Sequence, residues 1–122
     1  MEFQLPNYVY RATVNRVVDG DTIDVDIDVG FNTTLRKRLR FLGIDTWEVR
    51  GEEKEKGLVA KARLQEILDQ AEVIYVQTKM DATGKYGRVL AWVWTDCTES
   101  GDHLTNVNEL LLEEGHGTAY PE

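Results

Sequence analysis

The chain has 122 residues, enough for one domain with a hydrophobic core and too few for two ordinary domains. Hydrophobic residues make up 42% and charged residues 30%, a globular composition that excludes long disordered tracts. The net charge of −8 argues against a protein that holds nucleic acid by bulk electrostatic attraction.

The sequence also bears on the cellular compartment. The single cysteine, Cys97, cannot form an internal disulfide, and no apolar run approaches the ~20 residues of a membrane-spanning helix. Residues 1–4 have neither the basic nor the apolar region of a signal peptide. We therefore expect a single domain over residues 1–122 that is cytoplasmic, monomeric and independent of membranes.

Alternating apolar residues predict strands in the first half of the chain. Residues 8–14 alternate, and the Asp-Gly-Asp of residues 19–21 is typical of a tight turn. Residues 23–29 alternate between β-branched residues and aspartates, the pattern of a half-buried strand. After a turn at residues 30–32, a third strand is expected over residues 35–44.

The second predicted strand carries aspartates on one face, and the third carries arginines on one face. One antiparallel register opposes Asp24 to Arg40, and another, shifted by two residues, opposes Thr22 to Arg40; both leave acids opposite bases. We expect the second register, because it leaves Arg40 free for a substrate. The acids and bases concerned are Asp24, Asp26, Asp28, Arg36 and Arg38.

Helical spacing follows the third strand. The apolar positions that share one helical face are Leu58, Ala62, Leu64, Ile67, Leu68 and Ala71. Residues 73–78 and 89–95 then predict two more strands, with turn residues at 81–84 between them.

A final helix is expected from Leu104 or Val107 to Glu114. Asn106 and Glu109 have the spacing of a capping box, and Gly115 stands where a helix-ending glycine belongs. The order β-β-β-α-β-β-α predicts an α+β, mainly β fold: a five-stranded Greek-key barrel of the OB type with two helices.

Three polar clusters lie at the predicted turns and strand ends. They are Asp19-Gly20-Asp21-Thr22, Arg40 with Asp45-Thr46-Trp47-Glu48, and Lys85-Tyr86-Gly87-Arg88. Carboxylate oxygens suit hard cations such as Ca²⁺, and paired guanidinium groups match phosphate oxygens. A spare carboxylate can take a proton from water. The clusters together favour metal-assisted hydrolysis of a phosphodiester.

Plainer interpretations accompany these clusters. An Asp-Gly-Asp sequence is usually only turn chemistry, and the aspartates of residues 24–28 are interpreted as a solvated face paired with Arg36 and Arg38. Trp47 either stacks on a nucleobase or covers the core.

The motifs, in this order, resemble the staphylococcal nuclease family from about residue 11 to residue 120. The segments that carry the resemblance are residues 18–22, 40–48, 85–88 and 107–111. It implies an OB-fold barrel with three helices and Ca²⁺-dependent hydrolysis of DNA and RNA that leaves 3′-phosphate ends.

The resemblance also assigns roles to single residues. Asp21, Asp45 and the Thr46 carbonyl would bind calcium with Asp19 near them; Arg40 and Arg88 would clamp the phosphate; Glu48 would be the general base; and Lys85, Tyr86 and Tyr120 would hold the terminal nucleotide.

Two departures from the family pattern affect the expected activity. Trp47 stands where the family usually has proline, so a looser aim of Thr46 and Glu48 is expected. Residues 50–56 carry three glutamates as well as three basic residues where the family has a basic loop, which should weaken the capture of polymeric DNA.

A non-catalytic OB-fold module that binds single-stranded nucleic acid or a protein partner is the competing interpretation. The negative charge and Trp47 favour the module, whereas the complete set of acids and arginines favours the nuclease. The sequence leaves open the choice between DNA and RNA.

Overall fold

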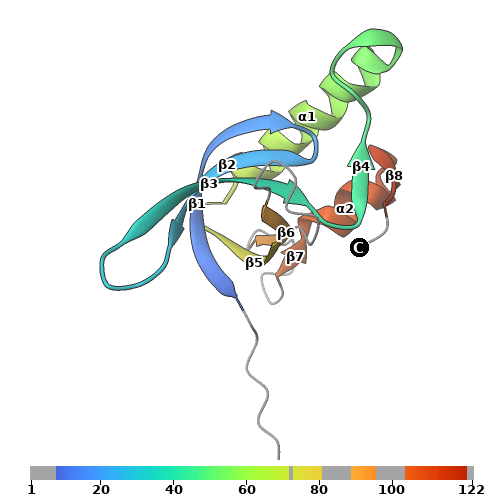
Figure 1. Ribbon diagram of the computed structural model, residues 1–122. Coiled ribbons are helices and arrows are strands. Elements are labelled where there is room, and N and C mark those ends of the chain that lie inside the picture. Colours follow the sequence, from blue (N-terminus) through green and yellow to red (C-terminus); the bar gives the residue numbers. More distant parts are fainter. Residues whose placement is uncertain (1–7, 72, 81–88, 96–103, 121–122) are drawn as a thin grey trace, which may run out of the picture.

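A closed, mixed β-barrel of five strands forms the body of the molecule. The computed structural model describes residues 8–71, 73–80, 89–95 and 104–120. The barrel strands are β1 (Val9–Asp19), β2 (Thr22–Asp28), β3 (Thr34–Phe41), β5 (Ile74–Met80) and β6 (Val89–Thr95). They pair in the order β3-β2-β1-β5-β6, and a parallel pairing of β3 with β6 closes the barrel (Figure 1). The expected α+β, mainly β barrel is confirmed.

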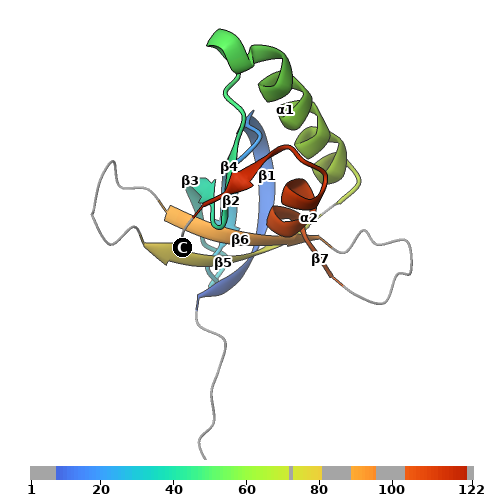
Figure 2. The ribbon, with the colours of Figure 1, turned by 90° about the vertical axis from the view of Figure 1, so that its right-hand side faces the viewer.

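Two α-helices and three short strands complete the described fold. Helix α1 (Lys54–Asp69) follows a 3₁₀ turn η1 (Gly51–Glu53), and α2 is Val107–Glu113. Strand β4 (Ile44–Thr46) pairs with β8 (Gly117–Ala119) next to α2, and β7 (Thr105–Asn106) pairs with β6 (Figure 2). Neither helix in the described part is long and apolar enough to cross a membrane.

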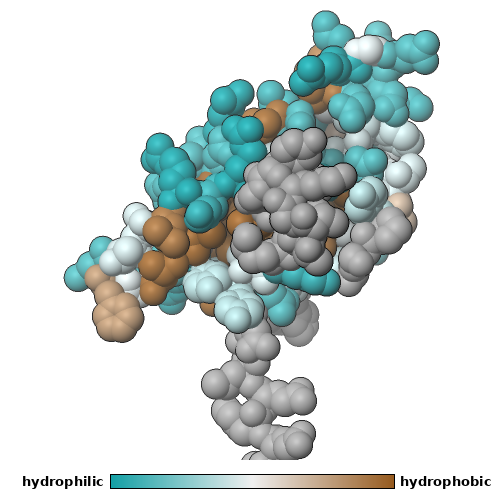
Figure 3. Space-filling model, viewed as in Figure 1, coloured by the Kyte–Doolittle hydropathy of each residue, from teal (hydrophilic) through white to brown (hydrophobic). Residues whose placement is uncertain are grey.

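The hydrophobic core fills the barrel as the alternation in β2 predicts. Ile23, Val25 and Ile27 are buried, while the aspartates between them face outward and are partly exposed. The core also contains Leu39, Phe41, Ile44, Leu64, Ile74, Val76, Val93, Val107 and Leu111. Exposed apolar side chains gather on the β2–β3 hairpin, where Phe31 and Leu35 lie (Figure 3).

The register of β2 with β3 is the one expected from the charges. Thr22 lies opposite Arg40, and Asp24 lies opposite Arg38. Arg38 donates two hydrogen bonds to Asp24, of 2.7 and 3.1 Å, and Arg36 donates one of 3.1 Å to Asp26. The interpretation of these aspartates as a paired surface is confirmed.

The third predicted strand is too long. Strand β3 ends at Phe41, and β4 begins separately at Ile44. Gly43 between them has a φ of +78°, and a Cβ there would lie 2.9 Å from the ring of Trp92. A left-handed residue packed this tightly turns the chain, which the apolar alternation did not reveal.

The buried face of α1 also differs from the predicted one. The helix begins at Lys54, and Leu58 and Ala62 lie on its exposed side. Its buried side begins with the small residues Gly57 and Ala60. These residues let the helix approach other backbone closely, and a count of large apolar residues overlooks them.

The predicted ends of the remaining elements are correct in some places and wrong in others. Helix α2 begins at Val107, capped by the Asn106 side chain, which accepts a 3.1 Å hydrogen bond from the Glu109 amide. The alternative start at Leu104 is wrong. At the other end Gly115 has a φ of +81°, as expected. Tyr8 lies outside β1 and is exposed, contrary to the predicted alternation.

Candidate active site

The candidate site lies where the β1–β2 turn, the end of β3 and strand β4 meet. Gly20 makes this meeting possible, because a Cβ at Gly20 would lie 2.9 Å from both Ala60 in α1 and the Thr46 hydroxyl. The turn therefore packs directly against β4 and α1. Asp21 is the residue between this glycine and the start of β2, and its side chain belongs to the site.

Asp21 is a buried carboxylate held by two donors. Its Oδ1 accepts a 2.9 Å hydrogen bond from the Thr22 hydroxyl, and its Oδ2 accepts one of 3.0 Å from the Thr46 amide. Its own carbonyl accepts from the Phe41 amide at 2.8 Å. Asp21 thus joins β2, β3 and β4 and is fixed in orientation.

Arg40 binds both backbone and carboxylates. Its Nη1 donates to the carbonyls of Phe41 and Ile44, each at 2.8 Å. Its Nη2 lies 3.4 Å from Oδ2 of Asp21 and 3.3 Å from Oδ1 of Asp45. The side chain is only 16% exposed. One guanidinium nitrogen is therefore shared by two carboxylates.

The β4–β8 pair places the remaining described residues of the site. Asp45 lies opposite Thr118, and its side chain is half exposed. Thr46 is buried opposite Gly117, where a Cβ would meet the Asp45 carbonyl at 2.4 Å. Beyond β8, the amide of Tyr120 donates to the Gly43 carbonyl, and its ring centroid lies 5.7 Å from the Arg40 guanidinium.

Two further predicted residues flank this cluster in the sequence. Glu48 is exposed and follows β4 by two positions, and its carboxylate has no hydrogen bond or ion pair with the described residues. Asp19 is half-buried at the end of β1, opposite Thr22. Arg88, Lys85 and Tyr86 lie outside the described residues, and their roles stay predictions.

The donor set suits a hard cation. Across the described ranges, no three His, Cys, Asp or Glu side chains are grouped as metal ligands. The carboxylates of Asp21 and Asp45 both lie close to one nitrogen of the Arg40 guanidinium, and the backbone amide of Thr46 donates to Asp21. Carboxylate and carbonyl oxygens are the ligand types that hard cations take.

Several charged side chains outside the candidate site are held in pairs. The hydrogen bond from Arg38 lowers the pKa of Asp24, and the one from Arg36 lowers the pKa of Asp26. On the helical side, the guanidinium of Arg63 binds Glu114 in a bidentate manner at 2.7 and 2.9 Å and lowers its pKa. Arg63 thereby joins α1 to the end of α2.

Trp47 is anchored, contrary to the looser aim expected from the loss of proline. Its amide donates to the His116 carbonyl at 3.2 Å, and its indole Nε1 donates to the Gly115 carbonyl at 3.1 Å. Proline would supply neither donor. Trp47 lines a groove between α1 and the α2–β8 turn and is not part of the core cluster. Stacking on a base stays a prediction.

Asn108, which lies in the motif of residues 107–111 and was assigned no role from the sequence, supports the site from α2. It is 2% exposed, and its Nδ2 donates to the carbonyls of Leu42 and Ala91 at 2.8 and 2.9 Å. Its Oδ1 accepts from the Val93 amide at 3.0 Å. The bonds dock α2 on β6 and on the β3–β4 connection. An asparagine on the apolar face of an expected helix was the available indication.

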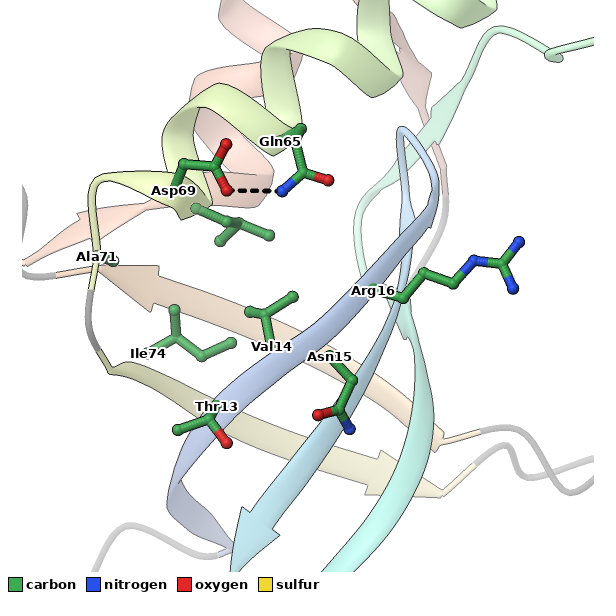
Figure 4. A pocket seen from close by; sticks show the side chains of 9 residues that line it. Thr13, Val14, Asn15, Arg16, Gln65, Asp69, Ala71 and Ile74 are labelled. Carbon is green, nitrogen blue, oxygen red and sulfur yellow. Dashed lines mark hydrogen bonds between the residues drawn. The ribbon is translucent and has the colours of Figure 1, made fainter.

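A separate hollow lies between β1 and the C-terminal end of α1 (Figure 4). Asn15 and Arg16 line it from the irregular part of β1, and Gln65 donates a 2.7 Å hydrogen bond to Asp69 on its helical side. None of the predicted site residues lines it, so the hollow is distinct from the candidate site.

Comparison with known proteins places the chain in a family. The family model described as "Staphylococcal nuclease homologue" matches residues 38–121. The chain is 34% identical over 113 residues to "Micrococcal nuclease" of Shigella flexneri, with 91% of this chain and 59% of that protein covered.

Two Bacillus subtilis proteins are also similar. "Endonuclease YhcR" is 34% identical over 119 residues, covering 91% of this chain and 9% of its own length. "SPbeta prophage-derived endonuclease YokF" is 34% identical over 107 residues, covering 85% of this chain and 32% of its own length. The chain thus spans less than two thirds of each of these relatives. The family match nevertheless covers most of the chain, from β3 through β8. The chain therefore belongs to the staphylococcal nuclease homologue family.

Proposed function

We propose that this chain is a Ca²⁺-dependent nuclease that hydrolyses phosphodiester bonds in DNA or RNA. The observation that carries the proposal is the shared guanidinium nitrogen of Arg40, 3.4 Å from Asp21 and 3.3 Å from Asp45. A phosphodiester hydrolase needs acidic oxygens for a metal and a nearby cation for the phosphate. Family membership and the names of the similar endonucleases support the same chemistry.

Asp21, Asp45 and the carbonyl of Thr46 are the residues that would hold calcium. Asp21 is already oriented by the bonds from Thr22 and the Thr46 amide, so little ordering is needed on binding. Asp19 would add negative charge near them. Bound calcium would polarise the phosphoryl group and orient the attacking water.

Arg40 is built to bind a phosphate oxygen. Two backbone carbonyls fix its Nη1, which leaves Nη2 to face the anions of the site. A fixed donor stabilises charge that develops in the transition state without reorganisation. Arg88 would be the second clamp, and Tyr120 beside Arg40 would contact the terminal nucleotide together with Lys85 and Tyr86.

Glu48 would accept the proton of the attacking water. Water oxygen then bonds to phosphorus, the bond from phosphorus to the 5′-oxygen breaks, and the leaving oxygen takes a proton from solvent. The products are a 3′-phosphate and a 5′-hydroxyl. The exposed position of Glu48, without a partner among the described residues, leaves its carboxylate available as a base.

Cleavage of end-labelled DNA and RNA oligonucleotides tests the proposal. With Ca²⁺ we expect cleavage to fragments with 3′-phosphate ends, and we expect a chelator to abolish it. Mg²⁺ should substitute poorly, because it demands a smaller and more rigid octahedral shell. Binding of single strands without cleavage under any metal would overturn the proposal in favour of the non-catalytic module.

A further inference from the structure

Trp47 continues the β4–β8 pairing by one more hydrogen bond. Thr46 lies opposite Gly117, and the next bond runs from the Trp47 amide to the His116 carbonyl at 3.2 Å. The indole adds a second bond, from Nε1 to the Gly115 carbonyl at 3.1 Å. The residue before Glu48 is thus fastened through both its backbone and its side chain.

The partner of Trp47 is itself rigid. Gly115 and His116 close the end of α2, since their amides donate to the carbonyls of Leu112 and Leu111 at 3.1 and 3.0 Å. The helix is docked through the buried amide of Asn108. The turn that receives Trp47 is therefore fixed to the barrel.

Helix α1 holds the same segment from its other side. The ammonium group of Lys56 lies 5.0 Å from the centroid of the Trp47 ring, within range of a cation–π interaction. The next residue, Gly57, is buried, and a Cβ there would meet the Glu48 carbonyl at 1.9 Å. The backbone at Glu48 is therefore in direct contact with the helix.

Glu48 depends on these contacts for its direction. Its carboxylate has no hydrogen bond or ion pair with the described residues, so no polar contact among them fixes where it points, and the placement of its backbone matters more. We propose that Trp47 is a positioning residue for Glu48. It fixes the segment between β4 and η1 and so holds the general base beside Asp21, Asp45 and Arg40. This inference rests on the proposed nuclease function.

A double-mutant cycle in the full chain tests the inference. Trp47→Phe keeps an aromatic ring over Lys56 and removes only the indole donor, whereas Trp47→Ala removes both contacts. We expect kcat to fall about tenfold for Trp47→Phe and up to about a hundredfold for Trp47→Ala, with KM little changed, since misplacement by ~1 Å costs rates of this order. In the Glu48→Gln background neither substitution should lower kcat further.

Trp94→Phe is the matched control. Trp94 is half-buried in β6 opposite Tyr75, and it contributes no hydrogen bond to the Glu48 segment. Its loss should leave kcat within about twofold. A purely structural role of Trp47 would lower kcat equally with and without Glu48, and that result would overturn the inference.

Amide hydrogen exchange separates this inference from the nuclease proposal. Trp47→Phe should speed exchange at the backbone amide of residue 47, because that bond to His116 loses its support from the indole. Unchanged exchange would overturn the positioning role whether or not the protein cleaves nucleic acid. Faster exchange in a protein that shows no Ca²⁺-dependent cleavage would retain the anchoring of the segment and refute only the nuclease function.

Discussion

At the scale of single residues, Arg40 combines two sets of contacts that no other cationic side chain in the described part combines. It satisfies two carbonyls at the β3–β4 turn and faces two carboxylates with the same guanidinium. Only a planar, forked group can make both sets of contacts at once. The side chain therefore supports the turn and the candidate site together.

Arg40→Lys should abolish most of the activity even though it preserves charge. We expect turnover to fall by ~10²–10³, as for removal of a fixed donor to the transition state. Arg11→Ala, at an exposed position of β1 away from the site, is the control and should retain activity. Near wild-type kcat for Arg40→Lys in a cleavage assay would remove the clamp role.

Asn108 docks α2 on the barrel through its buried side-chain amide. Asn108→Ala leaves the Val93 amide and the Leu42 carbonyl without their partner in a buried place. Each unsatisfied group costs about 1–3 kcal/mol, so for two groups we expect a loss of about 2–6 kcal/mol in the free energy of unfolding.

Urea unfolding measures this loss against a matched asparagine. Asn106→Ala removes the cap of the same helix and should cost only about 1 kcal/mol. Equal losses for the two variants would show that the Asn108 network is not what docks α2.

At the scale of elements, an ion pair outside the candidate site joins α1 to the α2–β8 turn. Arg63 in α1 makes two hydrogen bonds to Glu114, which follows α2, and a third to Glu66. The pairing keeps the pKa of Glu114 below its ordinary value of 4.5. It braces the turn that receives Trp47.

The lowered pKa gives stability a defined dependence on pH. The folded protein binds the Glu114 proton more weakly than the unfolded chain, so the contribution is complete above about pH 4.5 and is lost as pH falls through the lower folded pKa. Glu114→Gln should therefore destabilise at pH 7, by about 1 kcal/mol or less for so exposed a pair, and the difference should shrink in acid.

Urea unfolding of both proteins between pH 7 and pH 3 measures this difference. Glu113→Gln, the exposed neighbour, should cost nothing at any pH. A Glu114→Gln penalty that grows toward acid pH would contradict the pairing.

The same scale shows what the sequence could predict and what it could not. The alternation of β2 and the opposed charges of β2 and β3 predicted the face and the register, because both depend on neighbouring residues. Strand β8 has three residues and pairs with β4, which is distant in sequence, so no local periodicity indicated the strand or its pairing. The break at Gly43 likewise depends on its contact with Trp92, from another strand.

The candidate site likewise contains residues that the sequence predicted and contacts that it could not predict. Asp21, Arg40, Asp45 and Thr46 were found as motifs and do converge. The anchoring of Trp47 on Gly115 could not be foreseen, because it joins residues far apart in the chain.

At the scale of the whole molecule, a small barrel brings together acids and bases from separate parts of the chain. The β1–β2 turn supplies Asp21, β3 supplies Arg40, and β4 supplies Asp45. With a net charge of −8, the proposed binding of a phosphate depends on this local constellation and receives no help from a general positive field. Calcium bound at the acids would lower the local negative charge and help the substrate approach.

The response of two variants to calcium tests this account most directly. Initial rates of oligonucleotide cleavage are measured across a Ca²⁺ titration for the wild-type protein, Asp21→Asn and Glu48→Gln. Asp21→Asn should recover activity at least in part as Ca²⁺ rises, because it weakens the metal site. Glu48→Gln should stay slower by ~10²–10⁴ at every Ca²⁺ concentration, because glutamine cannot accept the proton. Glu48→Gln cleaving as fast as wild type, or wild-type cleavage unaffected by a chelator, would contradict the account.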